Sequence, residues 1–122
     1  MEEKWKELVE WGADYEGAVK RMMGDVAFYE NVLRKFYRKK EWEILREKLE
    51  EGDYRQAFLA AHDLKGVTVT LGLLPLWKSV SVVVEDMRTL PLSESKAGQL
   101  QKDYEQFFRE VDAFISVMEN LR

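Results

Sequence analysis

The chain contains no cysteine among its 122 residues. This absence excludes disulfide bonds, thiolate zinc sites and cysteine nucleophiles. A single histidine excludes a metal site built from several histidines. Only two prolines and seven glycines are present, so long irregular loops are not expected.

Long hydrophobic runs are also missing. No window approaches the roughly 18 apolar residues that a membrane-spanning helix needs. The first seven residues, MEEKWKE, have neither the basic start nor the apolar stretch of a signal peptide. We therefore expect a cytoplasmic protein that does not associate with membranes. A starting methionine and helices at both ends favour a stand-alone protein.

The composition is that of one folded domain. Hydrophobic residues make up 46% and charged residues 34%, with a net charge of −4. This balance predicts a single domain with one core over residues 1–122. No basic stripe is interleaved with exposed aromatic residues, so a nucleic acid is not an expected partner. The apolar stripes can all be used internally, which predicts a monomer.

Apolar residues recur at helical spacing along most of the chain, and glycine, aspartate or serine separates the runs. The predicted helices span residues 2–12, 14–23, 26–38, 41–51, 54–71, 75–88 and 93–118. A break near residues 39–40 and one continuous helix through them are both compatible with the sequence. In segment 26–38, the predicted core stripe consists of Phe28, Val32, Leu33 and Phe36.

Residues 67–71 and 80–84 are rich in β-branched side chains, which favour strands. A two-stranded hairpin is therefore an alternative, in which Gly66 would end a helix. Two isolated strands would be marginally stable and would leave their edges unpaired. We therefore predict helix for both stretches. The expected fold is all-α: an antiparallel four-helix bundle with short additional N-terminal helices.

The single histidine, His62, lies in the sequence AAHDLKG of residues 60–66. Ala61 and Leu64 face the predicted core, so His62 is expected on the wet side of its helix, with Lys65 and Gly66 one turn later. A neutral imidazole is a nucleophile, and an ammonium group can offset the charge of a phosphoryl group. Glycine leaves room for a partner. The residue types alone leave an ordinary surface histidine as the alternative.

The stretch from His62 to Gly72 resembles the signature of histidine-containing phosphotransfer (HPt) domains. That signature is a histidine, two residues, Lys-Gly, five residues and a second glycine. The flanking residues 52–54 (GDY) and 21–25 (RMMGD) are also similar to members of this family. The resemblance covers residues 14–120.

The resemblance implies a role for each matching residue. His62 would accept the phosphoryl group, Lys65 would stabilise it, and Gly66 would leave space for the partner. Many relatives place a polar residue that contacts the histidine at the position of Val84, where this chain departs from the pattern. Neighbouring residues that would replace it are Ser81, Glu85 and Arg88. The implied docking surface includes Leu59, Val69 and Trp77.

The implied function is that of a phosphocarrier and not an enzyme, because the chain has no ATP-binding segment. His62 would accept the phosphoryl group from a receiver-domain aspartate and pass it to another receiver domain in two-component signalling. The implied partners are response-regulator receiver domains and a hybrid histidine kinase. Mg²⁺ would bind to the receiver, and the chain itself would need no cofactor. The alternative is a phosphate-independent helical adaptor that binds a receiver or another signalling protein.

Overall fold

The computed structural model describes residues 2–121, and all regular elements in this range are helical. They are the 3-10 turn η1 (Glu3–Trp5) and the α-helices α1 (Lys6–Trp11), α2 (Tyr15–Arg21), α3 (Val26–Lys39), α4 (Trp42–Glu51), α5 (Tyr54–Thr70), α6 (Leu74–Asp86) and α7 (Glu94–Glu119). The all-α prediction is confirmed. Residues 67–70 lie in α5 and residues 80–84 lie in α6, so the hairpin alternative is wrong.

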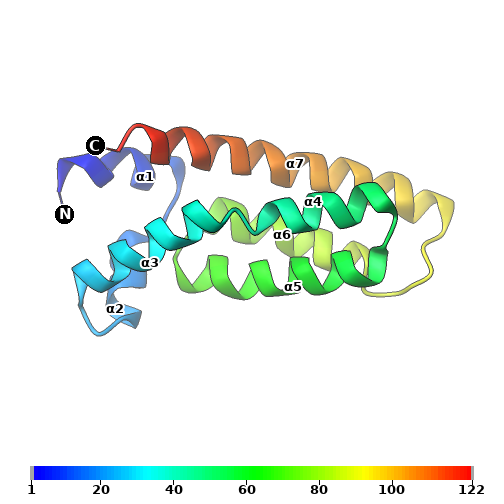
Figure 1. The fold of residues 1–122 in the computed structure, drawn as a ribbon, viewed down its shortest axis with the longest axis horizontal. Helices are drawn as coiled ribbons and strands as arrows, with labels where there is room; N and C mark the ends of the chain where they lie inside the picture. The colour runs from blue at the N-terminus through cyan, green and yellow to red at the C-terminus, as the bar shows by residue number, and fades with distance from the viewer. Residues whose placement is uncertain (1, 122) are drawn as a thin grey trace.

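Helices α4, α5, α6 and α7 lie side by side along the long axis of the molecule (Figure 1). Helix α5 packs against α4 and α6, and α6 packs against α7. Aromatic contacts join α7 back to α4, since the rings of Trp42 and Phe114 lie 6.1 Å apart. Helix α1 packs along α7, and α2 and α3 lie at the same end of the bundle (Figure 1). Helix α5 therefore has helical neighbours on two sides and a free outer face.

Four of the helices begin at a side chain that accepts a hydrogen bond from the backbone N–H three residues later. Such a bond satisfies one of the donors that the first turn leaves unpaired. The N-cap residues with this bond are Asp14, Asp25, Asp53 and Ser93. These are aspartate and serine residues of the kind that separates the apolar runs in the sequence, and each starts a helix.

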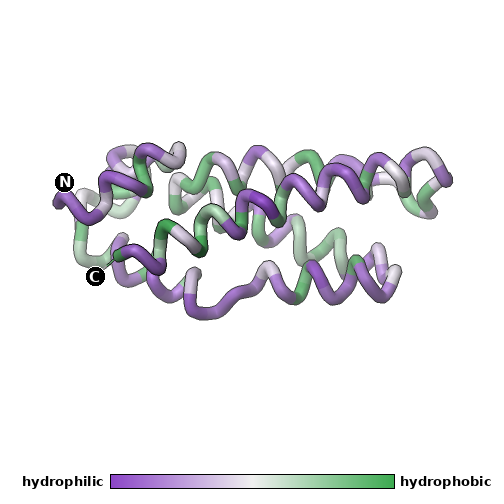
Figure 2. The backbone as a smooth tube through the Cα atoms, turned by 90° about the horizontal axis from the view of Figure 1, so that it is seen from above, coloured by the Kyte–Doolittle hydropathy of each residue, from purple (hydrophilic) through white to green (hydrophobic). Residues whose placement is uncertain are grey.

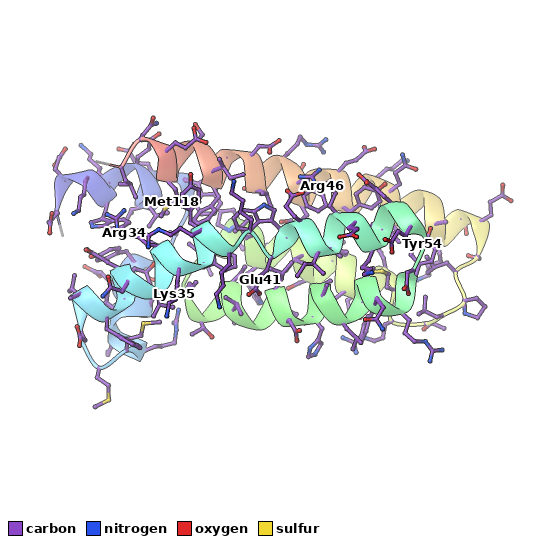
Figure 3. All side chains as sticks on the ribbon, viewed as in Figure 1. Arg34, Lys35, Glu41, Arg46, Tyr54 and Met118 are labelled. Carbon is purple, nitrogen blue, oxygen red and sulfur yellow. The ribbon has the colours of Figure 1, made fainter. Side chains whose placement is uncertain are left out.

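The helix is interrupted between α3 and α4 at Lys40. This residue adopts a left-handed backbone conformation, with φ of 50°, which interrupts the right-handed helix. Glu41 follows at the junction (Figure 3). The sequence alone was compatible with both a break and one continuous helix at this point.

Apolar residues recur along the helices between hydrophilic ones, as Figure 2 shows. One prediction for α3 is wrong: Phe28 is 54% exposed, and its neighbour Tyr29 is fully buried. The hydroxyl of Tyr29 donates a 2.8 Å hydrogen bond to the carbonyl oxygen of Leu71, and its ring packs edge-on against Tyr15. Tyr29 gains a polar partner as well as an apolar environment, which explains why it is the buried residue of the two.

The C-terminal end of α5 is held by the N-terminal segment. Arg21 donates hydrogen bonds to the carbonyl oxygens of Val69 and Thr70 at 2.9 and 3.1 Å. The backbone N–H of Asp14 donates to the carbonyl oxygen of Gly72 at 2.7 Å. The bonds to Thr70 and Gly72 satisfy carbonyl groups that the end of a helix leaves unpaired, and the carbonyl oxygen of Val69 also accepts from the backbone N–H of Gly72. The segment thereby fixes the end of the helix that carries the single histidine.

Candidate functional site

His62 lies near the middle of α5, and its side chain is exposed. The preceding and following core residues, Ala61 and Leu64, are buried, so the imidazole lies on the outer part of the helix as predicted. Among the described residues 2–121, no side chain or backbone group is hydrogen-bonded to this imidazole. Its ring nitrogens are therefore open to an incoming group.

Lys65 and Gly66 lie one turn beyond His62 on the same helix. Lys65 is half-buried, so its stem is packed against the protein while its charge stays near the surface. Gly66 is helical and exposed, and a Cβ added there would meet no atom within 4 Å. The surface next to the imidazole is thus one cation and an unobstructed stretch of backbone.

Phe58 lies one turn before His62 and is its aromatic neighbour. The two ring centroids are 6.1 Å apart, with an angle of 35° between the planes. The resemblance implies no role for Phe58, although its spacing of four residues from His62 is a local signal that places both on one side of a helix. Its ring covers one flank of the imidazole and narrows the directions from which a partner can approach.

The position on α6 that departs from the HPt pattern is fully buried. Val84 has no exposed surface, so it contributes to the core between α5 and α6. Ser81, one turn earlier, donates its hydroxyl to the carbonyl oxygen of Trp77 at 2.6 Å. Neither residue supplies a hydrogen bond to His62. In this structure Ser81 therefore does not make the contact with His62 that was suggested for it.

Glu85 and Arg88 form an ion pair on the exposed side of α6. The guanidinium of Arg88 donates to both carboxylate oxygens of Glu85 at 2.9–3.1 Å. The same guanidinium lies 5.8 Å from the centroid of the Phe58 ring. Arg88 and His62 therefore share Phe58 as a neighbour, and Glu85 is linked to this group through its ion pair with Arg88. The hydrogen bonds from Arg88 hold the pKa of Glu85 below its usual range, and the charges of Arg88 and Lys65 add to this effect.

An open groove of about 770 Å³ runs along the other side of His62. It lies between α5 and the region where α3 meets α4, and Val32 and Glu41 contribute to its wall. The α5 residues that line it are His62, Asp63, Gly66, Val67 and Thr70. The contributions of α3 and Glu41 could not be found from the sequence, because they depend on the break at Lys40.

The residues expected at a docking surface differ in exposure. Leu59 and Val69 are 52% and 38% exposed, and both lie on α5 within two turns of His62. Trp77 is half-buried on α6. Leu59 and Val69 thus present apolar surface on the same helix as His62, whereas Trp77 presents less.

A second group of titratable residues lies away from His62, between α6 and α7. Asp86 is partly buried, and one of its carboxylate oxygens is shielded from solvent without a hydrogen-bond partner. Burial raises the pKa of Asp86 to about 7, the nearby carboxylate of Asp103 raises it further, and the charge of Lys96 opposes them. Gln99 donates its amide to both oxygens of Asp103. This pair is a feature of the helix interface.

Within residues 2–121, no group of three or more histidine, cysteine, aspartate or glutamate side chains is arranged to hold a metal ion. None of the helices in this range is long and apolar enough to cross a membrane. Comparisons with protein-family models, curated proteins and solved structures found no match to this chain.

Proposed function

We propose that this protein is a phosphocarrier, in which His62 accepts a phosphoryl group from the aspartyl phosphate of a receiver domain and passes it to another. The observation that carries the proposal is the exposed, unpaired imidazole on α5 with Lys65 and Gly66 one turn away. The HPt-like spacing from His62 to Gly72 supports the same function. Partners would be response-regulator receiver domains and a hybrid histidine kinase.

The transfer needs little from this chain beyond position and charge. A ring nitrogen of neutral His62 attacks the phosphorus in line, the N–P bond forms, and the P–O bond to the aspartate breaks. The aspartate leaves as a carboxylate, and the imidazole releases its N–H proton to solvent. Lys65 is close enough in sequence and on the helix surface to pair with the phosphoryl oxygens. Bound at the receiver, Mg²⁺ would supply further charge stabilisation.

The experiment is transfer from a radiolabelled, phosphorylated receiver domain to the purified protein. We expect label that is labile in acid and stable in alkali, as for phosphohistidine. His62→Gln should not take up label, and far-UV circular dichroism should show that this variant remains folded. Label on His62→Gln, or no label on the unsubstituted protein with several receivers, would contradict the proposal.

A second candidate is a helical adaptor that binds a receiver or another signalling protein without carrying phosphate. The buried Val84 favours it, because no polar group of α6 is hydrogen-bonded to His62. In this case a receiver would bind the protein and the His62→Gln variant with equal affinity, and neither would take up label. Titration calorimetry together with the labelling assay separates the two functions.

A further inference from the structure

We propose that Glu85 is a positioning residue, a surface carboxylate that holds the Arg88 guanidinium away from His62 and so limits how strongly the protein stabilises a phosphoryl group there. This inference rests on the proposed phosphocarrier function. It concerns the charges around His62, and it is testable without a receiver domain.

The Arg88 guanidinium and the His62 imidazole are both neighbours of the Phe58 ring. The Arg88 guanidinium lies 5.8 Å from the Phe58 ring centroid, and that centroid lies 6.1 Å from the centroid of His62. Three hydrogen bonds of 2.9–3.1 Å tie the guanidinium to Glu85 in this position. The guanidinium therefore lies within about 12 Å of the imidazole centroid. Arginine has a long, flexible stem, so release from Glu85 would let the guanidinium turn toward a phosphoryl group on His62.

Lys65 adds to the same local arrangement. Its positive charge lowers the pKa of Glu85 by less than Arg88 does, and Lys65 forms no ion pair within 4 Å among the described residues. Glu85 is therefore paired with Arg88 and also experiences the charge of Lys65. A phosphoryl group adds close to two negative charges and three strong acceptors, which would compete with Glu85 for both cations.

This competition has a functional consequence. A carrier must accept a phosphoryl group and also release it, so very tight binding of the group would slow the second transfer. Glu85 repels the phosphoryl group and occupies Arg88, which lowers the stability of phosphorylated His62. Val84 cannot supply the hydrogen bond that the resemblance implies from α6, and in this proposal the Glu85–Arg88 pair acts on the charge at His62 in its place.

The experiment uses phosphoramidate, a small phosphoryl donor, to phosphorylate His62 chemically. The imidazole nitrogen forms the new N–P bond, the P–N bond of phosphoramidate breaks, and ammonia leaves with the imidazole proton as ammonium. The last ionisation of the phosphoryl group is then followed by ³¹P NMR as a function of pH. Glu85→Gln should lower the midpoint by roughly half a pH unit, because it removes an anion and frees a cation.

The chain contains a matched control on α4. Glu43 and Arg46 form the same type of ion pair three residues apart, and Arg46 lies 4.0 Å from the Phe108 ring centroid. Figure 3 labels Arg46 on this helix. Glu43→Gln should leave the ³¹P midpoint unchanged. An equal shift for Glu43→Gln and Glu85→Gln, or no shift for either, would overturn the proposal.

Glu85→Gln is also made in an Arg88→Gln background, which tests whether Glu85 acts through Arg88. Arg88→Gln should raise the midpoint, and Glu85→Gln should have a smaller effect in that background than alone. Shifts of the same size in both backgrounds would overturn the positioning role. Failure of phosphoramidate to modify His62 would also overturn it. Failure of transfer from receivers, with the expected ³¹P shifts present, would instead contradict only the phosphocarrier function.

Discussion

Replacing Gly66 with alanine is expected to stabilise the fold while impairing the proposed transfer. Gly66 lies inside α5, and a Cβ there would meet no atom within 4 Å. Alanine should therefore gain about 0.5–1 kcal/mol from its higher helix propensity without a clash. For a domain of 122 residues this corresponds to a rise in Tm of about 2–4 °C.

Thermal unfolding followed by circular dichroism at 222 nm measures this effect. Gly98 is a matched control, because it lies in α7 and its added Cβ would also meet nothing within 4 Å. Gly98→Ala should raise Tm by a similar amount. A fall in Tm for Gly66→Ala, together with a rise for Gly98→Ala, would refute the conclusion that α5 is a regular, unobstructed helix at Gly66.

The same two variants separate stability from access to His62. In the proposed transfer a receiver would approach over residue 66, so Gly66→Ala should slow transfer from a phosphorylated receiver by roughly tenfold to a hundredfold. Gly98→Ala should transfer at the unsubstituted rate. Equal transfer rates for all three proteins would show that Gly66 has no steric role.

Two further predictions concern stability. Gly72→Ala should destabilise the protein by about 3 kcal/mol or more in urea unfolding, because Gly72 has φ of 71° and a Cβ would overlap the carbonyl oxygen of Asp14; a loss below about 1 kcal/mol would contradict this close approach. Folded Asp86 keeps its proton to about pH 7, whereas the unfolded chain loses it near pH 4, so the free energy of unfolding should fall as the pH rises between these values and then level off. Asp86→Asn should remove this fall and be more stable than the unsubstituted protein by about 1 kcal/mol at pH 8. This magnitude is small because solvent screens a partly exposed pair. Equal stability of both proteins at pH 4 and at pH 8 would contradict the raised pKa.

The sequence predicted those features that depend on local spacing. The helix starts follow from aspartate and serine N-caps, and the exposure of His62 follows from the buried positions of Ala61 and Leu64. A periodic pattern could not decide which of Phe28 and Tyr29 is buried, because both are aromatic and neighbouring residues differ by only about 100° around a helix. Tyr29 is buried since its hydroxyl reaches Leu71, a contact between residues far apart in sequence.

The candidate site also contains features that local spacing predicted and features that depend on how the helices pack. Lys65 and Gly66 were predicted from their place one turn after His62 on one helix. The approach of Arg88 to Phe58 depends on how α5 and α6 pack, and no pattern within either segment contains that information. Glu41 in the groove wall depends on the break in the chain before α4.

The ties between the N-terminal segment and the end of α5 also constrain the order of folding. Arg21 and Tyr29 bond to carbonyl groups 42 to 49 residues later in the chain. During synthesis, which proceeds from the N-terminus, both residues are made before their acceptors. These hydrogen bonds can therefore form only after the end of α5 has been made. Docking of the segment around α2 onto α5 is expected to be a late step of folding.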